Sequence, residues 1–238
     1  MTDNLDTRVS PAVDPETYRS IEGVNDETAQ FVGGVINTFN DAYVTLGKIH
    51  DARELWASNP AVTKEGAVVI VAKEGDKQKL RVLKRFDLAS RDLAANIEHA
   101  ERQLMDPLTE RAGQGSLNTE VRDHVKALSR SEREAFMTDA LGRDDDLTLT
   151  ALLGAPPFLS GLTPLDRNHY LRLYNTKKRP ELVRRLDVMN RFRERLDRIG
   201  PVLHAQFARA IGAEPGVAAH LQRANEQALA ALNIQPTA

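Results

Sequence analysis

Apolar residues recur at every third or fourth position through most of the chain, and this is the period of an amphipathic α-helix. The first such stretch runs from Asp26 to about Ser58 and ends at Asn59-Pro60. Its apolar stripe consists of Phe31, Val35, Phe39, Ala42, Leu46, Ile49 and Trp56. Each interior glycine, at positions 33, 34 and 47, costs about 1 kcal/mol relative to alanine. These glycines therefore either allow a close helix approach or mark a break.

The period changes between about residues 67 and 86. Residues 67–72 (AVVIVA) form a continuous, largely β-branched run, and Leu80, Val82 and Phe86 then alternate with charged neighbours. Both patterns favour strands, so we predict a β-hairpin at about 67–86 with its turn in residues 74–77. Because an isolated hairpin is marginal in water, this one must pack on helices of its own chain or pair with a strand of another chain.

Helical spacing returns after Asp87, which can serve as an N-cap. The stripe of this second long helix consists of Leu93, Ile97, Ala100, Leu104 and Leu108. Pro107 kinks or ends the helix, and residues 112–116 (AGQGS) form a flexible joint. We therefore expect three parts: an arm over residues 1–25, long helices with the hairpin over 26–112, and a helical array over 117–233.

Between residues 117 and 233 the sequence pattern predicts shorter helices, which are separated by residues typical of helix starts and stops. Ser131 followed by Glu134 predicts a capping box, and Gly200-Pro201 kinks or breaks a longer helix. Other starts are indicated at Asp144 or Asp145, Thr163-Pro164 and Pro180, and other stops at Gly142, Gly154 and Gly212. The last helix carries Val217, Leu221, Ala224, Ala228 and Leu232 at helical spacing. The expected fold class is mainly α, an antiparallel helical array with one β-hairpin in the N-terminal half.

The amino-acid composition limits the fold and the chemistry that the protein can have. Hydrophobic residues make up 41% of the 238 positions and aromatic residues only 5%, which suits interdigitating helices. The sequence has no cysteine, which excludes disulfides, thiolate nucleophiles, cysteine-ligated zinc and iron–sulfur clusters. Residues 1–10 lack the features of a signal peptide, and the longest apolar run is far below the roughly 20 residues of a membrane span. We expect a soluble protein without a membrane partner.

Charge is distributed unevenly, although the formal net charge is only -2. Residues 1–28 contain seven acidic and two basic side chains, whereas residues 172–198 contain ten basic and four acidic ones. Residues 1–25 also contain Pro11, Pro15 and few apolar groups. We expect them to form an acidic arm that is extended or partly disordered.

The basic region is the sharpest candidate for an interaction surface. Four of its arginines are separated by seven, four and three residues, so they share one helix face. The candidate surface consists of Lys177, Lys178, Arg179, Arg184, Arg191, Arg195 and Arg198. Such a row could follow the phosphates of a nucleic acid or face a protein partner. Asp187, Glu194 and Asp197 are placed to pair with these arginines, which is typical of an ordinary solvated helix.

The remaining sequence offers no recognisable catalytic, cofactor or metal motif. Asp144-Asp145-Asp146 lacks EF-hand spacing and precedes a helix, where acids cap free amides. The six histidines are dispersed, Ser160 lacks the context of a nucleophile elbow, and there is no phosphate-binding glycine loop. We therefore expect no enzyme activity, no cofactor and no metal.

Three segments carry a resemblance: residues 128–133 (LSRSER), 152–163 (LLGAPPFLSGLT) and 180–182 (PEL). Together they resemble a pattern that recurs in small helical proteins of tailed bacteriophages and prophages, over roughly residues 117–200. Because such proteins are mostly uncharacterised, the resemblance implies a phage setting and supplies no site residues.

The leading hypothesis from the sequence is a non-enzymatic bacteriophage structural or assembly protein. Helices would form its scaffold, and the arm and hairpin would engage other phage structural proteins or further copies of the chain. It would be located in the host cytoplasm during assembly, or in the virion. The alternative is a nucleic-acid-associated or regulatory protein that uses the basic helix at about 177–198.

Overall fold

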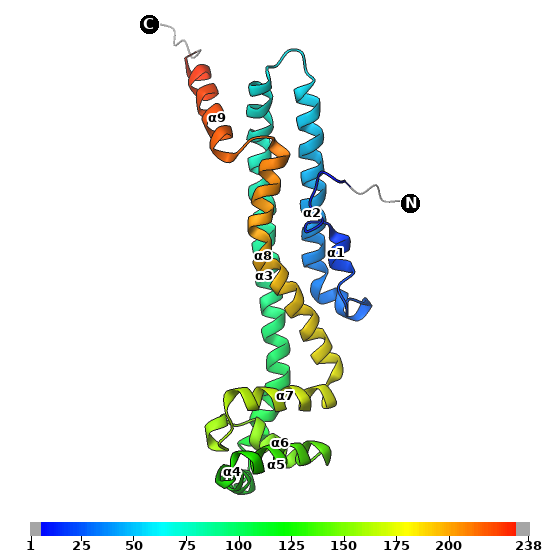
Figure 1. Cartoon of the computed structure of the whole chain (residues 1–238), viewed down its shortest axis with the longest axis vertical. Coiled ribbons are helices and arrows are strands. Elements are labelled where there is room, and N and C mark those ends of the chain that lie inside the picture. Colours follow the sequence, from blue (N-terminus) through cyan, green and yellow to red (C-terminus); the bar gives the residue numbers. More distant parts are fainter. Residues whose placement is uncertain (1–5, 232–238) are drawn as a thin grey trace. The chain divides into compact units, whose positions relative to one another are not determined.

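The computed structural model describes residues 6–231, and within them the secondary structure is entirely helical (Figure 1). The helices are α1 (Pro15–Arg19), α2 (Asp26–Ala57), α3 (Lys64–Ala112), α4 (Ser116–Ala127), α5 (Arg130–Gly142), α6 (Asp146–Leu153), α7 (Pro164–Lys178), α8 (Pro180–Ile211) and α9 (Pro215–Ala230), with a 3-10 turn η1 (Pro157–Leu159). The chain divides into two compact units, residues 1–94 with 188–238 and residues 95–187. The prediction of a mainly α fold is confirmed.

The predicted β-hairpin is wrong, because residues 67–86 lie inside α3. Ala67 and Val71 are buried four residues apart, as are Val82 and Phe86, whereas Leu80 is 69% exposed. This is the period of a helix and not the alternation of a strand. The low helix propensity of valine and isoleucine amounts to only about 0.7 kcal/mol per residue at most. Burial of one helical stripe outweighs that cost.

The expected hairpin turn is also a helical segment. Its Gly75 allows the end of α8 to approach α3, since an added Cβ would lie 2.9 Å from Cγ1 of Ile211. Close approach of two helices is a common reason for an interior glycine. Gly47 in α2 has a similar role, because its Cβ would lie 3.2 Å from the carboxylate of Asp6.

Helix α2 confirms the first long helix predicted from the sequence. It begins with a capping box formed by Asn25 and Thr28 and ends at Ser58. An added Cβ at Gly33 or Gly34 would meet nothing within 4 Å, and the helix continues through both. These two glycines therefore mark neither a break nor a close contact.

An aromatic cluster ties the helices of the unit 1–94 with 188–238 together. The rings of Tyr18 and Phe39 are stacked with centroids 3.6 Å apart, and Phe86 meets Phe39 edge-on at 4.9 Å. Phe192 of α8 lies 6.2 Å from Tyr18. Such pairs contribute beyond their buried area, so they link α1, α2, α3 and α8.

The segment before α2 differs from the extended or partly disordered arm expected over residues 1–25. Between residues 6 and 25 it forms turns and α1, with Val9, Val13 and Tyr18 buried. These three apolar side chains anchor the segment. The sequence did not predict this, because the segment as a whole has low hydrophobicity. The expectation for residues 1–5 lies outside the described residues.

The unit 95–187 is built around α6, whose residues 148–153 are all buried. Helices α4, α5 and α7 and the end of α3 surround it. The core consists of Leu108, Val125, Met137, Ala140, Leu149, Leu152, Leu153, Leu162, Tyr170 and Tyr174. A short helix that is buried on every side needs such a cage of longer helices.

Local start signals place most of the short helices. Thr163 caps α7 with Pro164 in the first turn, and Asp145 caps α6. The capping box of α5 is formed by Ser129 and Glu132 and not by Ser131 and Glu134. The Ser129–Glu132 pair has the same three-residue spacing as Ser131 and Glu134 but stands two residues earlier, so the helix begins earlier than predicted.

Two interior prolines do not end their helices. Helix α3 continues past Pro107 to Ala112, and α8 continues past Pro201 to Ile211. In each case the buried stripe goes on beyond the proline, with Leu108 in α3 and with Leu203, Phe207 and Ile211 in α8. The apolar contacts offset the loss of one backbone hydrogen bond.

Gly154, at the end of α6, gives a first test of this packing. An added Cβ would lie 2.1 Å from the carbonyl oxygen of Leu108 and 2.8 Å from Cβ of Ala112. We expect Gly154→Ala to lower the free energy of unfolding by roughly 1–3 kcal/mol or more, the usual cost of overpacking. Urea denaturation of the full chain measures it.

The matched control is Gly33→Ala in α2, where the added methyl group meets no atom within 4 Å. It should raise the free energy of unfolding by about 1 kcal/mol through helix propensity alone. Equal effects of the two substitutions would contradict the contact between α6 and α3.

Candidate functional site

A groove of about 450 Å³ lies between α2 and α3, which run side by side next to their connecting loop (Figure 1). Ile49 and Val71 are buried in its floor, and Val44 and Ile70 on its walls are 45% and 37% exposed. The lining consists of Asp41, Val44, Thr45, Lys48, Ile49, Ala52, Trp56, Ile70, Val71, Glu74, Gly75, Gln78 and Arg81. An apolar floor with polar edges is typical of a binding groove.

Polar contacts fix one end of the groove. Arg81 pairs with Asp41 at 2.9 Å and donates a hydrogen bond to the Thr45 hydroxyl, also at 2.9 Å. Toward the loop, Glu74 accepts a hydrogen bond from Gln78, which lowers the pKa of the Glu74 carboxyl. The walls are thus held in place by charges at the rim, and the centre offers apolar surface. This arrangement suits binding of an apolar segment.

Helix α9 carries an apolar stripe that its own chain leaves largely uncovered. Ala218 is buried, and Gln222 donates a hydrogen bond to Asp76 at 3.4 Å. Val217 and Leu229, however, are 54% and 57% exposed. The apolar stripe predicted through Val217, Leu221, Ala224 and Ala228 is therefore mostly at the surface, and the last residue predicted in it, Leu232, lies outside the described residues.

The first four candidate basic residues lie in the unit 95–187 and are engaged locally. Lys177 and Lys178 both pair with Asp144, at 3.2 and 2.8 Å. Arg179 donates a hydrogen bond to the Gln103 carbonyl, and Arg184 pairs with Glu181. Asp144 of the acidic triplet therefore binds lysines, while Asp145 caps α6.

The other three candidates lie in the unit formed by residues 1–94 and 188–238. Arg191 binds the carbonyl and the carboxylate of Glu22, and within residues 6–231 neither Arg195 nor Arg198 forms an ion pair. The predicted surface is thus divided between two compact units. Several of its charges are neutralised by acids that lie far away in the sequence. Neither unit contains all seven residues, and their use as one interaction surface stays a prediction.

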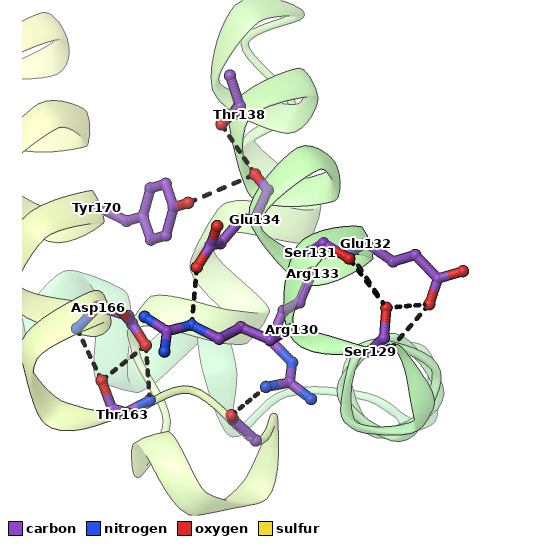
Figure 2. Close-up of polar contacts among 11 residues, drawn as sticks. Ser129, Arg130, Ser131, Glu132, Arg133, Glu134, Thr138, Thr163, Asp166 and Tyr170 are labelled. Carbon is purple, nitrogen blue, oxygen red and sulfur yellow. Dashed lines mark hydrogen bonds and ion pairs between the residues drawn. The ribbon is translucent and has the colours of Figure 1, made fainter.

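Two of the segments that carry the phage resemblance, residues 128–133 and 152–163, meet at Arg133, which Figure 2 shows among its neighbours Ser129 to Glu134. The Arg133 guanidinium donates hydrogen bonds to the carbonyls of Val125, Leu128 and Gly161. Figure 2 also shows the Ser129–Glu132 and Thr163–Asp166 capping pairs and the 3.0 Å contact between Arg130 and Glu134. These side chains tie a loop to two helices, which is a structural role.

A polar cluster covers α2 near its middle. Arg8 pairs with Asp6, Asp51 and Glu54 at 2.7–2.9 Å, and the backbone amide of Asp6 donates to the Tyr43 hydroxyl. Hydrogen bonding from Arg8 lowers the pKa of Asp6 to about 2. The Asp6 carboxylate therefore stays charged beside Arg8, and the contacts of Arg8 with Asp51 and Glu54 hold the N-terminal segment on α2.

His50 lies beneath this cluster and is only 2% exposed. Neither of its ring nitrogens has a hydrogen-bond partner among the described residues. Burial lowers its pKa, and the positive charges of Arg53, Arg8 and Arg209 add to the effect against the opposing charge of Asp6. The sequence showed His50 only as one of six dispersed histidines, because nothing local distinguishes it.

Within residues 6–231, no group of three or more histidine, aspartate or glutamate side chains comes together that could hold a metal ion, and none of those helices is long and apolar enough to cross a bilayer. No protein-family model matches the chain, and neither a curated protein nor a solved structure matches it.

The lowered pKa of His50 predicts how stability depends on pH. The folded chain keeps the ring neutral, whereas the unfolded chain takes up a proton below the ordinary value of 6.5. We therefore expect the free energy of unfolding to fall as the pH drops from 7 to 5. His50→Leu should flatten that slope, and urea titrations at several pH values measure it.

His204→Leu is the matched control, because His204 is exposed on α8. It should leave the slope as in the parent chain. A slope that His50→Leu leaves unchanged would show that this buried imidazole does not couple folding to pH.

Proposed function

We propose that the protein is a non-enzymatic assembly protein that binds further copies of itself, with α9 of one copy in the groove between α2 and α3 of the next. The observation that carries the proposal is that one chain contains both features: an open apolar groove and an exposed apolar helix. Laying an amphipathic helix into a groove is a common mode of protein recognition. A groove on one copy and a helix on another make a head-to-tail contact that can extend into larger assemblies.

The dimensions of the two features agree. The groove-lining residues of α3 run from Ile70 to Arg81, a length of about 16 Å at 1.5 Å per residue. The stripe of α9 from Val217 to Ala228 spans the same number of residues, and therefore about 16 Å as well. One helix can fill the groove from end to end.

The charges also agree. His220 and Arg223 flank one side of the α9 stripe, and Glu74 is exposed on the α3 edge of the groove. An opposite charge at the edge of an apolar contact favours one orientation of the docked helix. Burial of one valine or leucine contributes roughly 1.5–3 kcal/mol, and association itself costs at least about 4 kcal/mol. We therefore expect a weak, concentration-dependent contact.

The phage setting is part of the proposal and rests on the three resembling segments alone. A virion or assembly component of a bacteriophage is a natural place for a self-associating helical protein with no catalytic motif. The nucleic-acid alternative has less support. Its basic residues are divided between two units, and Lys177, Lys178, Arg184 and Arg191 are paired with carboxylates.

Sedimentation velocity of the full chain over a micromolar concentration series tests the contact. We expect the parent protein to associate, and Val217→Glu and Ile70→Glu each to weaken association roughly tenfold or more, because each places a charge in an apolar contact. Leu80→Glu is the matched control, since Leu80 is 69% exposed on α3 and lies outside the groove. It should associate like the parent chain.

Mixing the two weakened variants sharpens the test. Val217→Glu retains an intact groove and Ile70→Glu an intact α9, so a head-to-tail contact predicts one-to-one heterodimers in the mixture and nothing larger. Arg223→Glu should weaken association, and Glu74→Lys in the same chain should restore part of it. A parent chain that stays monomeric throughout, or a mixture that does not form heterodimers, would contradict the proposal.

A further inference from the structure

The unit 95–187 contains a second concavity, of about 510 Å³, between α3, α7 and the first turns of α8. Its size lies within the range of small-molecule sites. The lining consists of Glu101, Leu104, Met105, Arg167, Asn168, Leu171, Arg172, Asn175, Val183, Leu186 and Asp187. All of these residues belong to one compact unit, so the pocket does not depend on the groove between α2 and α3.

Arg167 is a half-buried cation without a counter-charge in this pocket. Its Nε donates to the Leu153 carbonyl at 2.9 Å, and one terminal nitrogen lies 3.9 Å from the sulfur of Met105. Within residues 6–231 it pairs with no carboxylate, and burial lowers its pKa. Arg172, on the same helix, pairs with Asp187 at 3.1 Å. A desolvated cation of this kind is stabilised by an anion that reaches it.

Asn175 is the second polar group of this pocket. It belongs to the lining and is only 5% exposed. Buried amides nearly always have a hydrogen-bond partner. Asn175 lies eight residues after Arg167 in α7, about 12 Å along the same helix face. The pocket therefore has two separated polar requirements.

Apolar side chains occupy the space between these two groups. Leu104, Leu171, Val183 and Leu186 form the walls, together with the flexible side chain of Met105. Methionine adapts to irregular ligands. A cation at one end, an amide at the other and a hydrocarbon wall between them match an elongated amphiphile.

We propose that this pocket binds a small anionic amphiphile. Its carboxylate or phosphate would pair with Arg167, its hydrocarbon part would lie on the apolar walls, and a terminal hydroxyl would bond the Asn175 amide. Charge-assisted hydrogen bonds to a guanidinium fork supply the orientation, and the apolar walls supply the remaining affinity. Glu101 is exposed at the edge of the pocket, where its charge opposes an anion and provides no anchor.

Isothermal titration of the full chain with decanoate, decyl phosphate, ω-hydroxydecanoate and decanol tests this site. We expect saturable binding of both anions, with decanol weaker by roughly tenfold or more because it lacks the charge. The two anions decide whether a carboxylate or a phosphate fits better. The ω-hydroxyl should strengthen binding only while Asn175 is present, so Asn175→Leu should equalise decanoate and ω-hydroxydecanoate.

Arg167→Gln should weaken both anions to the level of decanol. Arg122→Gln is the matched control, because Arg122 also donates to backbone carbonyls, those of Ala112 and Ala151, but lies outside the pocket. It should leave the binding of both anions unchanged. Glu101→Gln should leave that binding unchanged or strengthen it slightly. Thermal unfolding shows whether each variant is folded, and Asn175→Leu provides a separate test should Arg167→Gln be unfolded.

Absence of saturable anion binding to the parent chain would overturn the proposal. Equal loss in Arg122→Gln and Arg167→Gln would also overturn it, since that result assigns Arg167 a purely structural role. Neither result bears on self-association, because the groove and α9 belong to the other unit.

Discussion

The buried stripe of α3 is the constraint on which the rest of the structure depends. In the first unit it presents Val71, Val82, Phe86 and Leu93 to the core, and in the second it presents Ile97, Ala100, Leu104 and Leu108. One side of α3 forms a wall of the groove with α2, and a later stretch forms a wall of the pocket with α7. Each unit therefore obtains both its core and its concavity from the same helix.

Local signals in the sequence predict much of this fold. The caps at Asp145 and Thr163, the proline starts of α7 and α8 and the glycine stop after Ile211 involve neighbouring residues only. Helix α2 is predicted because its stripe is long and regular. Such features need no knowledge of what each helix packs against.

The hairpin prediction failed because the local pattern there does not decide between a strand and a helix. A short continuous apolar run is compatible with a buried strand and with a buried helix segment. Burial of the helical stripe decides between them, and the residues packed against this part of α3 include Ile211, 136 positions after Gly75 in the chain. Contacts at that separation are not visible in local propensity. The buried anchors Val9, Val13 and Tyr18 were missed because they lie in a segment that is otherwise polar.

The candidate sites show the same difference between local features, which the sequence predicts, and long-range contacts, which it does not. The basic residues were visible in the sequence, but their partners Glu22, Asp144 and the Gln103 carbonyl were not. The groove and the pocket have no motif, since a concavity depends on which side chains fail to fill a space between helices. Only the stripe of α9 left a signal, and the sequence could not show that this stripe would remain exposed.

The helical state of residues 67–86 in α3 is the claim that the groove requires, and a distance measurement tests it most directly. The chain has no cysteine, so spin labels can be attached to cysteines introduced at Glu65 and Lys84, which are exposed on α3. In one helix the two backbone positions lie about 28 Å apart, and pulsed electron resonance should report a narrow distribution near that distance. In a hairpin with its turn at residues 74–77 they would lie on paired strands roughly 5 Å apart, and a short distance of that kind would contradict the account.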